Sequence, residues 1–137
     1  MLCILNDENQ NILQIRTVQR KPIEFHKTIW KTLRKYFDKL EILNFIKNVN
    51  ANKNNILFSI ACGYTDQEII ELTWNEIKRF MNLEEQIEYL KIKGKDGKNF
   101  AESYMERKFK KEDFDWIKNL MFEYGLGDQL ANIKSIV

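Results

Sequence analysis

Residues 54–82 read NNILFSIACGYTDQEIIELTWNEIKRFMN, and they contain the strongest local structure signals in the chain. Two helix-start signatures stand there in series, Thr65 with Glu68 and Thr73 with Glu76. In each, the threonine hydroxyl can accept from the backbone N–H three residues on, while the glutamate carboxylate accepts from the N–H of the threonine. The pattern predicts two helices that meet at a corner near Thr73.

The part of this stretch before Thr65 has the character of a buried helix. Residues 56–62 are almost entirely apolar, follow Asn54 and Asn55, either of which could open the helix, and end at Gly63. Asparagine is a favoured residue at a helix start, and glycine is favoured just past a helix end. We therefore expect 54–82 to form a helix, a turn, a short helix, a corner and a further helix.

Length and composition are those of one globular domain. The chain has 137 residues, of which 44% are hydrophobic and 31% charged, and its formal net charge is +2. This near balance gives no general argument for nucleic acid as a partner. No apolar run approaches the roughly 20 residues of a membrane span. Cys3 and Cys62 are isolated, which favours reduced thiols in a cytoplasmic protein.

The rest of the chain predicts a single-domain helical bundle, residues 1–137, with an N-terminal β-hairpin. Residues 1–20 hold two short apolar runs around a polar hexapeptide, as in a hairpin. Residues 22–49 have apolar positions at three- and four-residue steps, which indicates a long amphipathic helix with room for a break near Glu41. We expect helices over 83–137 with a basic loop at 94–99, and we see no internal repeat.

A second short hairpin near 90–103 is an open alternative. Residues 90–103 contain Asp96-Gly97, a dipeptide typical of tight turns between strands. An exposed basic loop between helices explains the same residues equally well.

The residues that carry catalysis or bind metals are sparse. His26 is the sole histidine, and the two cysteines are far apart in the sequence, so no four-ligand metal set can be assembled. Glu68 and Glu76 already have a structural role as capping partners. We expect no enzyme, no catalytic residue, no metal and no cofactor.

Two surfaces are candidates for a macromolecular partner. Trp74 would be the first helical residue after the Thr73 cap, and a half-exposed tryptophan at a corner suits a protein contact. We take Tyr64, Asp66 and Trp74 as the candidate partner-binding residues, although core packing is the alternative for the tryptophan. The second candidate is basic and could contact phosphates or simply be solvated. It consists of a cluster at the turn, Lys91, Lys93, Lys95 and Lys98, or of a stripe on the first long helix, Lys27, Lys31, Arg34 and Lys35.

Residues 63–77 carry gapless matches to a known motif at Gly63, Glu68, Leu72, Trp74, Glu76 and Ile77. They resemble the first catalytic box of the tyrosine recombinases (phage integrases). The run at 93–98 is similar to the β-hairpin that carries that family's catalytic lysine. Thr65 stands at the position of the catalytic arginine and no His-x-x-Arg box follows, so the resemblance implies a catalytically inactive DNA-binding protein.

The same stretch supports a second resemblance through Gly63, Thr65, Glu68, Leu72, Thr73, Glu76 and Ile77. It is similar to the later half of phage tail assembly chaperones, which are small helical proteins that often open with a short β-hairpin. The chain length, the charge and the expected hairpin at 2–18 fit this family. The resemblance implies binding of a tape-measure or tail protein during virion assembly.

We favour the second resemblance. It predicts a non-enzymatic protein-binding adaptor of phage or mobile-element type, with a phage tail protein or a host factor as its partner. A DNA-binding relative of the recombinases is the alternative, and a small phage inhibitor of a host factor is a third. We expect the contact surface at the mid-chain corner, beside the 94–99 loop, and no contact with a membrane.

Overall fold

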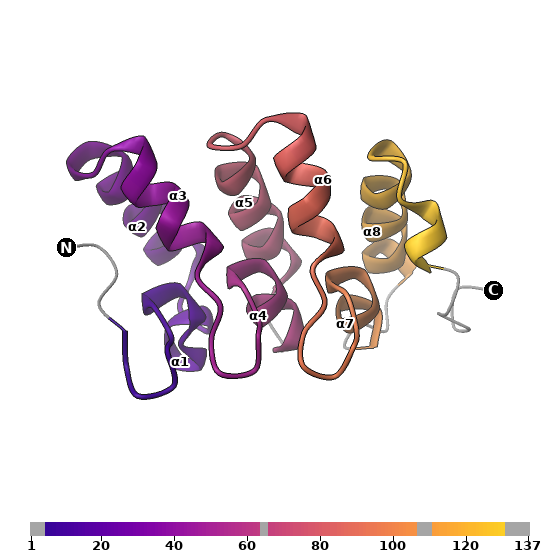
Figure 1. The fold of residues 1–137 in the computed structure, drawn as a ribbon, viewed down its shortest axis with the longest axis horizontal. Helices are drawn as coiled ribbons and strands as arrows, with labels where there is room; N and C mark the ends of the chain where they lie inside the picture. The colour runs from indigo at the N-terminus through magenta and orange to yellow at the C-terminus, as the bar shows by residue number, and fades with distance from the viewer. Residues whose placement is uncertain (1–4, 64–65, 107–110, 131–137) are drawn as a thin grey trace.

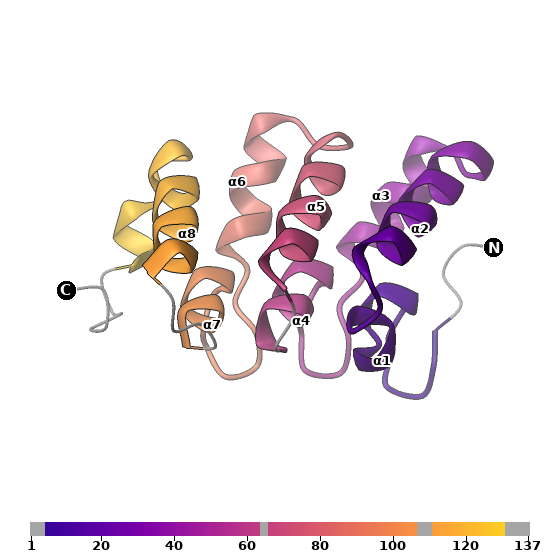
Figure 2. The ribbon, with the colours of Figure 1, turned by 180° about the vertical axis from the view of Figure 1, so that it is seen from behind.

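The computed structural model describes residues 5–63, 66–106 and 111–130. Within them lie eight α-helices and two short 3-10 helices, η1 (Ile12–Gln14), α1 (Arg16–Gln19), α2 (Ile23–Tyr36), α3 (Lys39–Lys47), α4 (Ile56–Cys62), α5 (Gln67–Lys78), α6 (Leu83–Lys91), α7 (Phe100–Glu106), α8 (Lys111–Glu123) and η2 (Gly127–Leu130). The prediction of a mainly helical fold is confirmed. The helices form three units that stand side by side along the long axis of the molecule (Figures 1 and 2).

The three units are copies of one structural repeat of 44 residues. The starts of α2, α5 and α8 are each 44 residues apart, and so are the starts of α3, α6 and η2. The helices α4 and α7 also have this spacing, and η1 with α1 takes their place in the first unit. We call the units repeat 1 (11–54), repeat 2 (55–98) and repeat 3 (99–130). Our reading of the sequence as free of internal repeats is therefore wrong.

An asparagine begins each repeat and caps its first helix. Asn11, Asn55 and Asn99 stand 44 residues apart, and all three are buried. The Asn55 side chain accepts from the backbone N of Phe58 at 2.8 Å, and that of Asn99 from the N of Glu102 at 2.9 Å. Such caps satisfy backbone donors that a helix start leaves unpaired. Because the caps lie inside the stack, they also fix where each short helix enters it.

The turn before each asparagine has one backbone conformation in all three repeats. The three turns comprise residues 6–10, 50–54 and 94–98. The fourth residue of each has a positive φ, 59° at Asn9, 61° at Lys53 and 82° at Gly97. In each turn the N–H of the first residue donates to the carbonyl of the fifth, at 3.2, 3.1 and 3.0 Å in chain order. The Asp-Gly signal was therefore read correctly as a tight turn.

Backbone hydrogen bonds join neighbouring turns into a row. The N of Ala51 donates to the carbonyl of Glu8 at 2.9 Å, and the N of Lys95 donates to the carbonyl of Asn52 at 3.0 Å. These two bonds are equivalent, since donors and acceptors are each 44 residues apart. Figure 1 shows the turns along the lower edge of the molecule. They hold the repeats at a constant spacing on that edge.

The two hairpins expected from the sequence are absent from the described residues. The N-terminal hairpin is wrong, because residues 12–18 form η1 and the first part of α1, while residues 1–4 lie outside the described part. Near 90–103 the only pairing described is a single antiparallel bridge between Lys93 and Asn99. The apolar run at 12–18 is the shorter first-repeat version of α4, so its apolar residues pack as a helix.

Two helix boundaries also differ from those expected. The helix predicted over 22–49 divides at Asp38, whose side chain accepts from the N of Glu41 at 2.8 Å and starts α3. The corner predicted at Thr73 is wrong. Thr73 lies inside α5, where its hydroxyl donates to the carbonyl of Ile69 at 2.7 Å. The signature at Thr65 lies outside the described residues, so α5 has a single described start, at Asp66.

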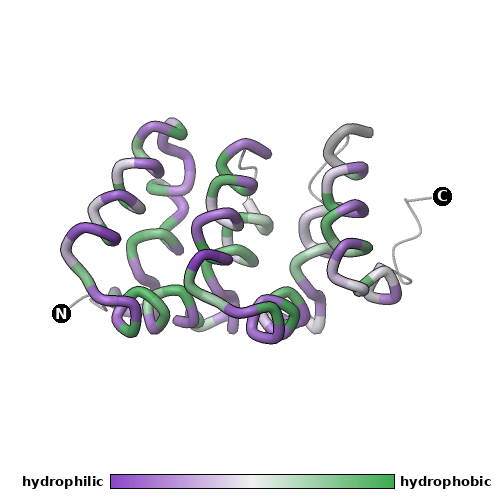
Figure 3. Tube along the Cα trace, turned by 90° about the horizontal axis from the view of Figure 1, so that it is seen from above, coloured by the Kyte–Doolittle hydropathy of each residue, from purple (hydrophilic) through white to green (hydrophobic). Residues whose placement is uncertain are grey.

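The core lies between the layers of the repeats and is rich in aromatic residues. Trp30 and Trp74, 44 residues apart, are 0% and 2% exposed. Each contacts the aromatic residue at one equivalent position, Phe45 at a centroid distance of 6.3 Å and Tyr89 at 6.4 Å. Figure 3 shows hydrophobic and hydrophilic stretches alternating along each long helix, as one buried face per helix requires. This shared core gives the repeats one rigid packing pattern.

Candidate polypeptide-binding groove

The residues proposed as a partner-binding corner do not form one exposed site. Trp74 is 2% exposed, between Tyr89 and Tyr124, whose ring centroids lie 6.4 and 5.8 Å away. Asp66 is exposed at the N-cap of α5, and Tyr64 lies outside the described residues. Trp74 is therefore a core residue, as the alternative interpretation of the sequence has it.

The four lysines of the basic segment are spread around the last stacked turn. Lys91, Lys93 and Lys95 are exposed, and Lys98 is half-buried. Lys91 lies 3.9 Å from a carboxylate oxygen of Glu88, and Lys98 lies 2.6 Å from one of Glu106. These ion pairs reduce the positive potential that a phosphate would meet.

A groove with an apolar floor lies between α3 of repeat 1 and α6 of repeat 2. It has a volume of about 520 Å³. Its floor is formed by Met81, Tyr89 and Ile92, which are 7%, 3% and 36% exposed. Figure 1 shows α3 and α6 on the same side of the molecule, in front of α2 and α5. The groove is therefore a product of repeat stacking and belongs to no single helix.

The rim of the groove is acidic. Glu84, Glu85 and Glu88 line it on α6, and Lys47 lines it on α3. Lys47 Nζ lies 3.5 Å from Glu85 Oε2 and so offsets one carboxylate. Hydrogen bonding from the backbone N of Asn82 is the main cause that lowers the pKa of Glu85, with Lys47 adding to it. These hydrogen bonds and the nearby cation favour the charged form of Glu85.

Tyr89 fixes the floor of the groove to both repeats. Its hydroxyl donates to the carbonyl of Ile46 at 3.0 Å, and its ring is stacked on Trp74. Complete burial raises the pKa of Tyr89 above its usual value, so the phenol stays a hydrogen-bond donor. The groove thus has a floor already held in place before any partner arrives.

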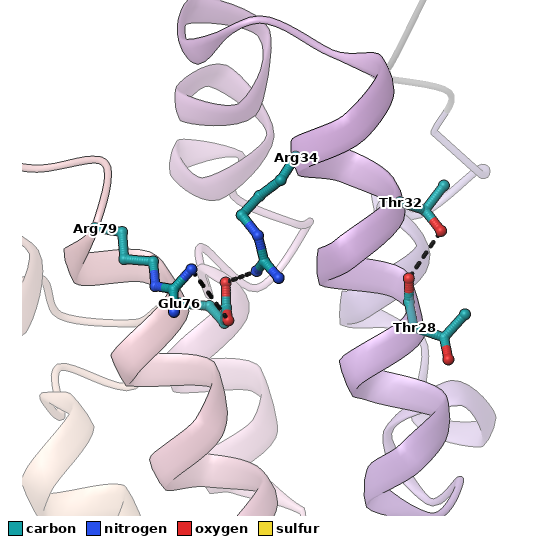
Figure 4. A network of polar contacts seen from close by, with 5 residues as sticks. All are labelled: Thr28, Thr32, Arg34, Glu76 and Arg79. Atoms are coloured by element: carbon teal, nitrogen blue, oxygen red, sulfur yellow. Dashed lines mark hydrogen bonds and ion pairs between the residues drawn. The ribbon is translucent and has the colours of Figure 1, made fainter.

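On the opposite side of the molecule an ion pair joins α2 to α5 (Figure 4). Arg34 contacts Glu76, and Arg79 lies 4.0 Å from the other oxygen of the same carboxylate. Glu76 was expected to be a capping partner of Thr73, but its side chain is only 9% exposed and carries this inter-repeat contact instead. The repeats on either side of the groove are thereby tied together from behind.

Within the described part of the chain, no group of three His, Cys, Asp or Glu side chains could hold a metal ion. His26 is fully buried, and this burial lowers its pKa. No helix in the ranges that the structure describes combines the length and apolarity needed to cross a membrane.

Sequence reasoning missed the groove because it missed the repeat. The signal was available in the Asn-Ile-Leu triplets at 11–13 and 55–57 and in the Trp30 and Trp74 pair, all at the 44-residue spacing. Aligning the chain on itself would have placed α3 beside α6. Comparison of the chain with protein-family models, curated proteins and solved structures gives no match.

Proposed function

We propose that this chain is a repeat-built binding module that takes a polypeptide into the groove between α3 and α6. The observation that carries the proposal is the pairing of an apolar floor with an acidic rim in a groove of about 520 Å³. Stacked helical repeats build extended binding surfaces of this kind in general. An apolar floor supplies affinity, and a charged rim selects the partner.

The chemistry of the groove specifies the bound segment. Met81, Tyr89 and Ile92 suit apolar side chains, whereas Glu84 and Glu88 favour lysine or arginine beside them. A short amphipathic helix with a basic flank has both features, and such helices commonly bind in grooves through residues spaced three and four apart. The partner is therefore a basic amphipathic segment of another protein.

The finer assignments drawn from the two resemblances remain proposals. A phage tail or tape-measure protein, as for tail assembly chaperones, is one source of such a segment, and a host factor is another. Binding of DNA, as the recombinase resemblance implies, would depend on Lys93 and Lys95, which are exposed and have no ion pair among the described residues. That binding would weaken steeply as salt rises.

A direct test uses a model peptide and a charge reversal. The probe is a fluorescein-labelled 15-residue peptide with leucine at helical spacing and lysine elsewhere, and the matched probe has glutamate in place of lysine. We expect polarisation to report binding of the lysine peptide only. Glu84→Lys with Glu88→Lys should weaken it about tenfold or more, which corresponds to about 1.4 kcal/mol.

The control reverses two charges at another hollow. Glu71 and Glu123 line a hollow between α5 and α8, so Glu71→Lys with Glu123→Lys changes the net charge equally. If this control weakens the peptide as much as the rim variant does, the attraction is a general charge effect and the groove is not the site. Equal binding of both peptides would also refute the proposal.

A further inference from the structure

The N-terminal end of the repeat stack exposes positions that the other repeats bury. Ile12 is 44% exposed, whereas its equivalents Ile56 and Phe100 are 0% and 2% exposed. Phe25 is 39% exposed, whereas its equivalent Ile69 is 4% exposed. Ile56, Ile69 and Phe100 belong to α4, α5 and α7, which pack against η1, α2 and α4 of the preceding repeat, respectively. Repeat 1 therefore presents an inter-repeat packing surface that no described residue covers.

This surface, which we call the end face, extends from η1 onto the outer side of α2. A hollow of about 420 Å³ opens on it, and its apolar lining is Leu5, Ile12, Ile15, Leu33 and Phe45. Thr28 and Thr32 project from α2 on the side away from α5 (Figure 4). Both threonines and Phe25 are exposed.

The two threonine hydroxyls of the end face can be buried without losing a hydrogen bond. The Thr28 hydroxyl donates to the carbonyl of Glu24 at 2.9 Å, and the Thr32 hydroxyl donates to the carbonyl of Thr28 at 2.8 Å. Both hydroxyl hydrogens are thus already bonded within α2. Burying these side chains leaves no unpaired hydroxyl donor, and an unpaired buried donor is the usual penalty for covering a polar group.

Repeat 1 is the most basic part of the chain, and it lacks most of the carboxylates that repeat 2 has at its junction with the preceding repeat. Residues 11–54 hold ten Lys and Arg residues against three Asp and Glu. At the positions where repeat 2 has Glu76, Glu84 and Glu88, repeat 1 has Thr32, Leu40 and Asn44. The lost carboxylates are those that lie at the junction with a preceding repeat. Glu41 keeps a carboxylate at the position of Glu85, the residue that meets Lys47 of the preceding repeat, so the end face has one carboxylate where the junction of repeat 2 has four.

We propose that the end face binds the end face of a second copy of this chain, in a two-fold symmetric dimer. A two-fold contact places one patch against itself, which a patch of several like charges resists and a mainly apolar patch permits. The other end of the stack is a poorer match. Repeat 3 has the half-buried Lys118 at the position of Trp30 and Trp74, so a head-to-tail contact would place a cation against the apolar end face.

The test is the oligomeric state of the full chain by sedimentation equilibrium between about 1 and 100 µM. We expect the unmodified chain to be a dimer in the upper part of this range. Thr32→Glu and, separately, Phe25→Glu should each raise the dimer dissociation constant at least about 100-fold. Asn75→Glu adds the same charge to the exposed side of α5 and should leave the constant unchanged. Far-ultraviolet circular dichroism checks that each variant keeps its helices.

Three results would overturn the proposal. The unmodified chain could be a monomer throughout the range, which means that a different occupant covers the end face. Dimers could form equally well in Thr32→Glu and Asn75→Glu, which places the contact elsewhere. Dimerisation could also be lost with Glu84→Lys and Glu88→Lys rather than with the end-face variants, which would make the groove a self-association site.

Discussion

Replacing Arg34 with methionine tests whether the ion pair behind the groove holds repeats 1 and 2 together. The change removes the main cation from Glu76, whose side chain is only 9% exposed. Breaking a buried pair usually costs about 3–5 kcal/mol, because one charge stays buried without a partner. Arg34 is 34% exposed and Arg79 stays 4.0 Å away, so part of the attraction survives. We expect the free energy of unfolding to fall by about 2–3 kcal/mol.

A second substitution should reverse most of this loss. Repeat 3 has Leu120 at the position of Glu76, and Leu120 is 8% exposed in a comparable junction. Glu76→Leu in the Arg34→Met background removes the orphaned carboxylate and fills the same space with apolar atoms. Such replacement of a whole buried pair is often neutral or stabilising. The double variant should therefore lie within about 1 kcal/mol of the unmodified chain.

Urea unfolding of the four proteins gives the coupling energy directly. We expect about 2 kcal/mol of coupling between the two sites. Lys27→Met is the control, because Lys27 pairs with Glu24 at 3.3 Å where both side chains are more than half exposed, and it should change stability by less than about 0.5 kcal/mol. Additive effects of Arg34→Met and Glu76→Leu would refute the claim that the pair joins the repeats.

Three further predictions follow from particular residues. Trp74→Ala should lower the free energy of unfolding by about 3–5 kcal/mol, because the indole is 2% exposed, and urea unfolding checks it. Lys53→Gly should raise it by about 0.5–1 kcal/mol and Gly97→Ala should lower it by about 1 kcal/mol, since both residues have positive φ and nothing lies near an added Cβ at Gly97. Burial lowers the pKa of His26, so the unfolded chain binds the extra proton and stability should fall as pH drops below about 6.5. His26→Gln should flatten that fall, which thermal unfolding at pH 7 and pH 5 would show.

Local signals predicted the helices well where a single residue type decides the backbone. The end of α4 at Gly63 and the turn at Asp96-Gly97 were placed correctly, and of the two residues expected to open α4, Asn54 and Asn55, the structure has Asn55 as the cap. The corner at Thr73 was wrong because a capping signature competes with the helical period around it. Ile69, Ile70 and Ile77 keep that period through Thr73, and the hydroxyl turns back to bond the preceding turn of its own helix.

The N-terminal region was misread because its secondary structure is set by repeat packing. Residues 12–18 have the β-branched composition of a strand, and tertiary context overrides such a preference. Gln19 shows how this occurs, since its side-chain amide donates to the carbonyl of Leu13 at 3.1 Å and to Ser59 Oγ at 2.9 Å. The bond to Ser59 needs α4 of the next repeat in place, so no local sequence pattern could predict it.

The candidate groove could not be predicted from local patterns for a similar reason. Its lining combines Lys47 of repeat 1 with residues of α6 and of the segments on either side of that helix in repeat 2. The groove can be located by comparing the residues at equivalent positions of the three repeats. A residue that is apolar in all three repeats packs between repeats. A residue that differs from its equivalents indicates a contact or function particular to its own repeat.

The series at positions 32, 76 and 120 illustrates how far such comparison reaches. Thr32, Glu76 and Leu120 occupy one place in three copies of the same unit, but each meets a different neighbour. Glu76 meets Arg34 of the preceding repeat, Leu120 is buried beside repeat 2, and Thr32 lies on the end face with its hydroxyl already bonded to its own helix. If Thr32 served only solubility, a charged residue could replace it without any effect on dimerisation. Substituting Thr32 with glutamate, lysine and serine in turn therefore separates the two explanations, because only an interface there would reject both charges and accept the serine.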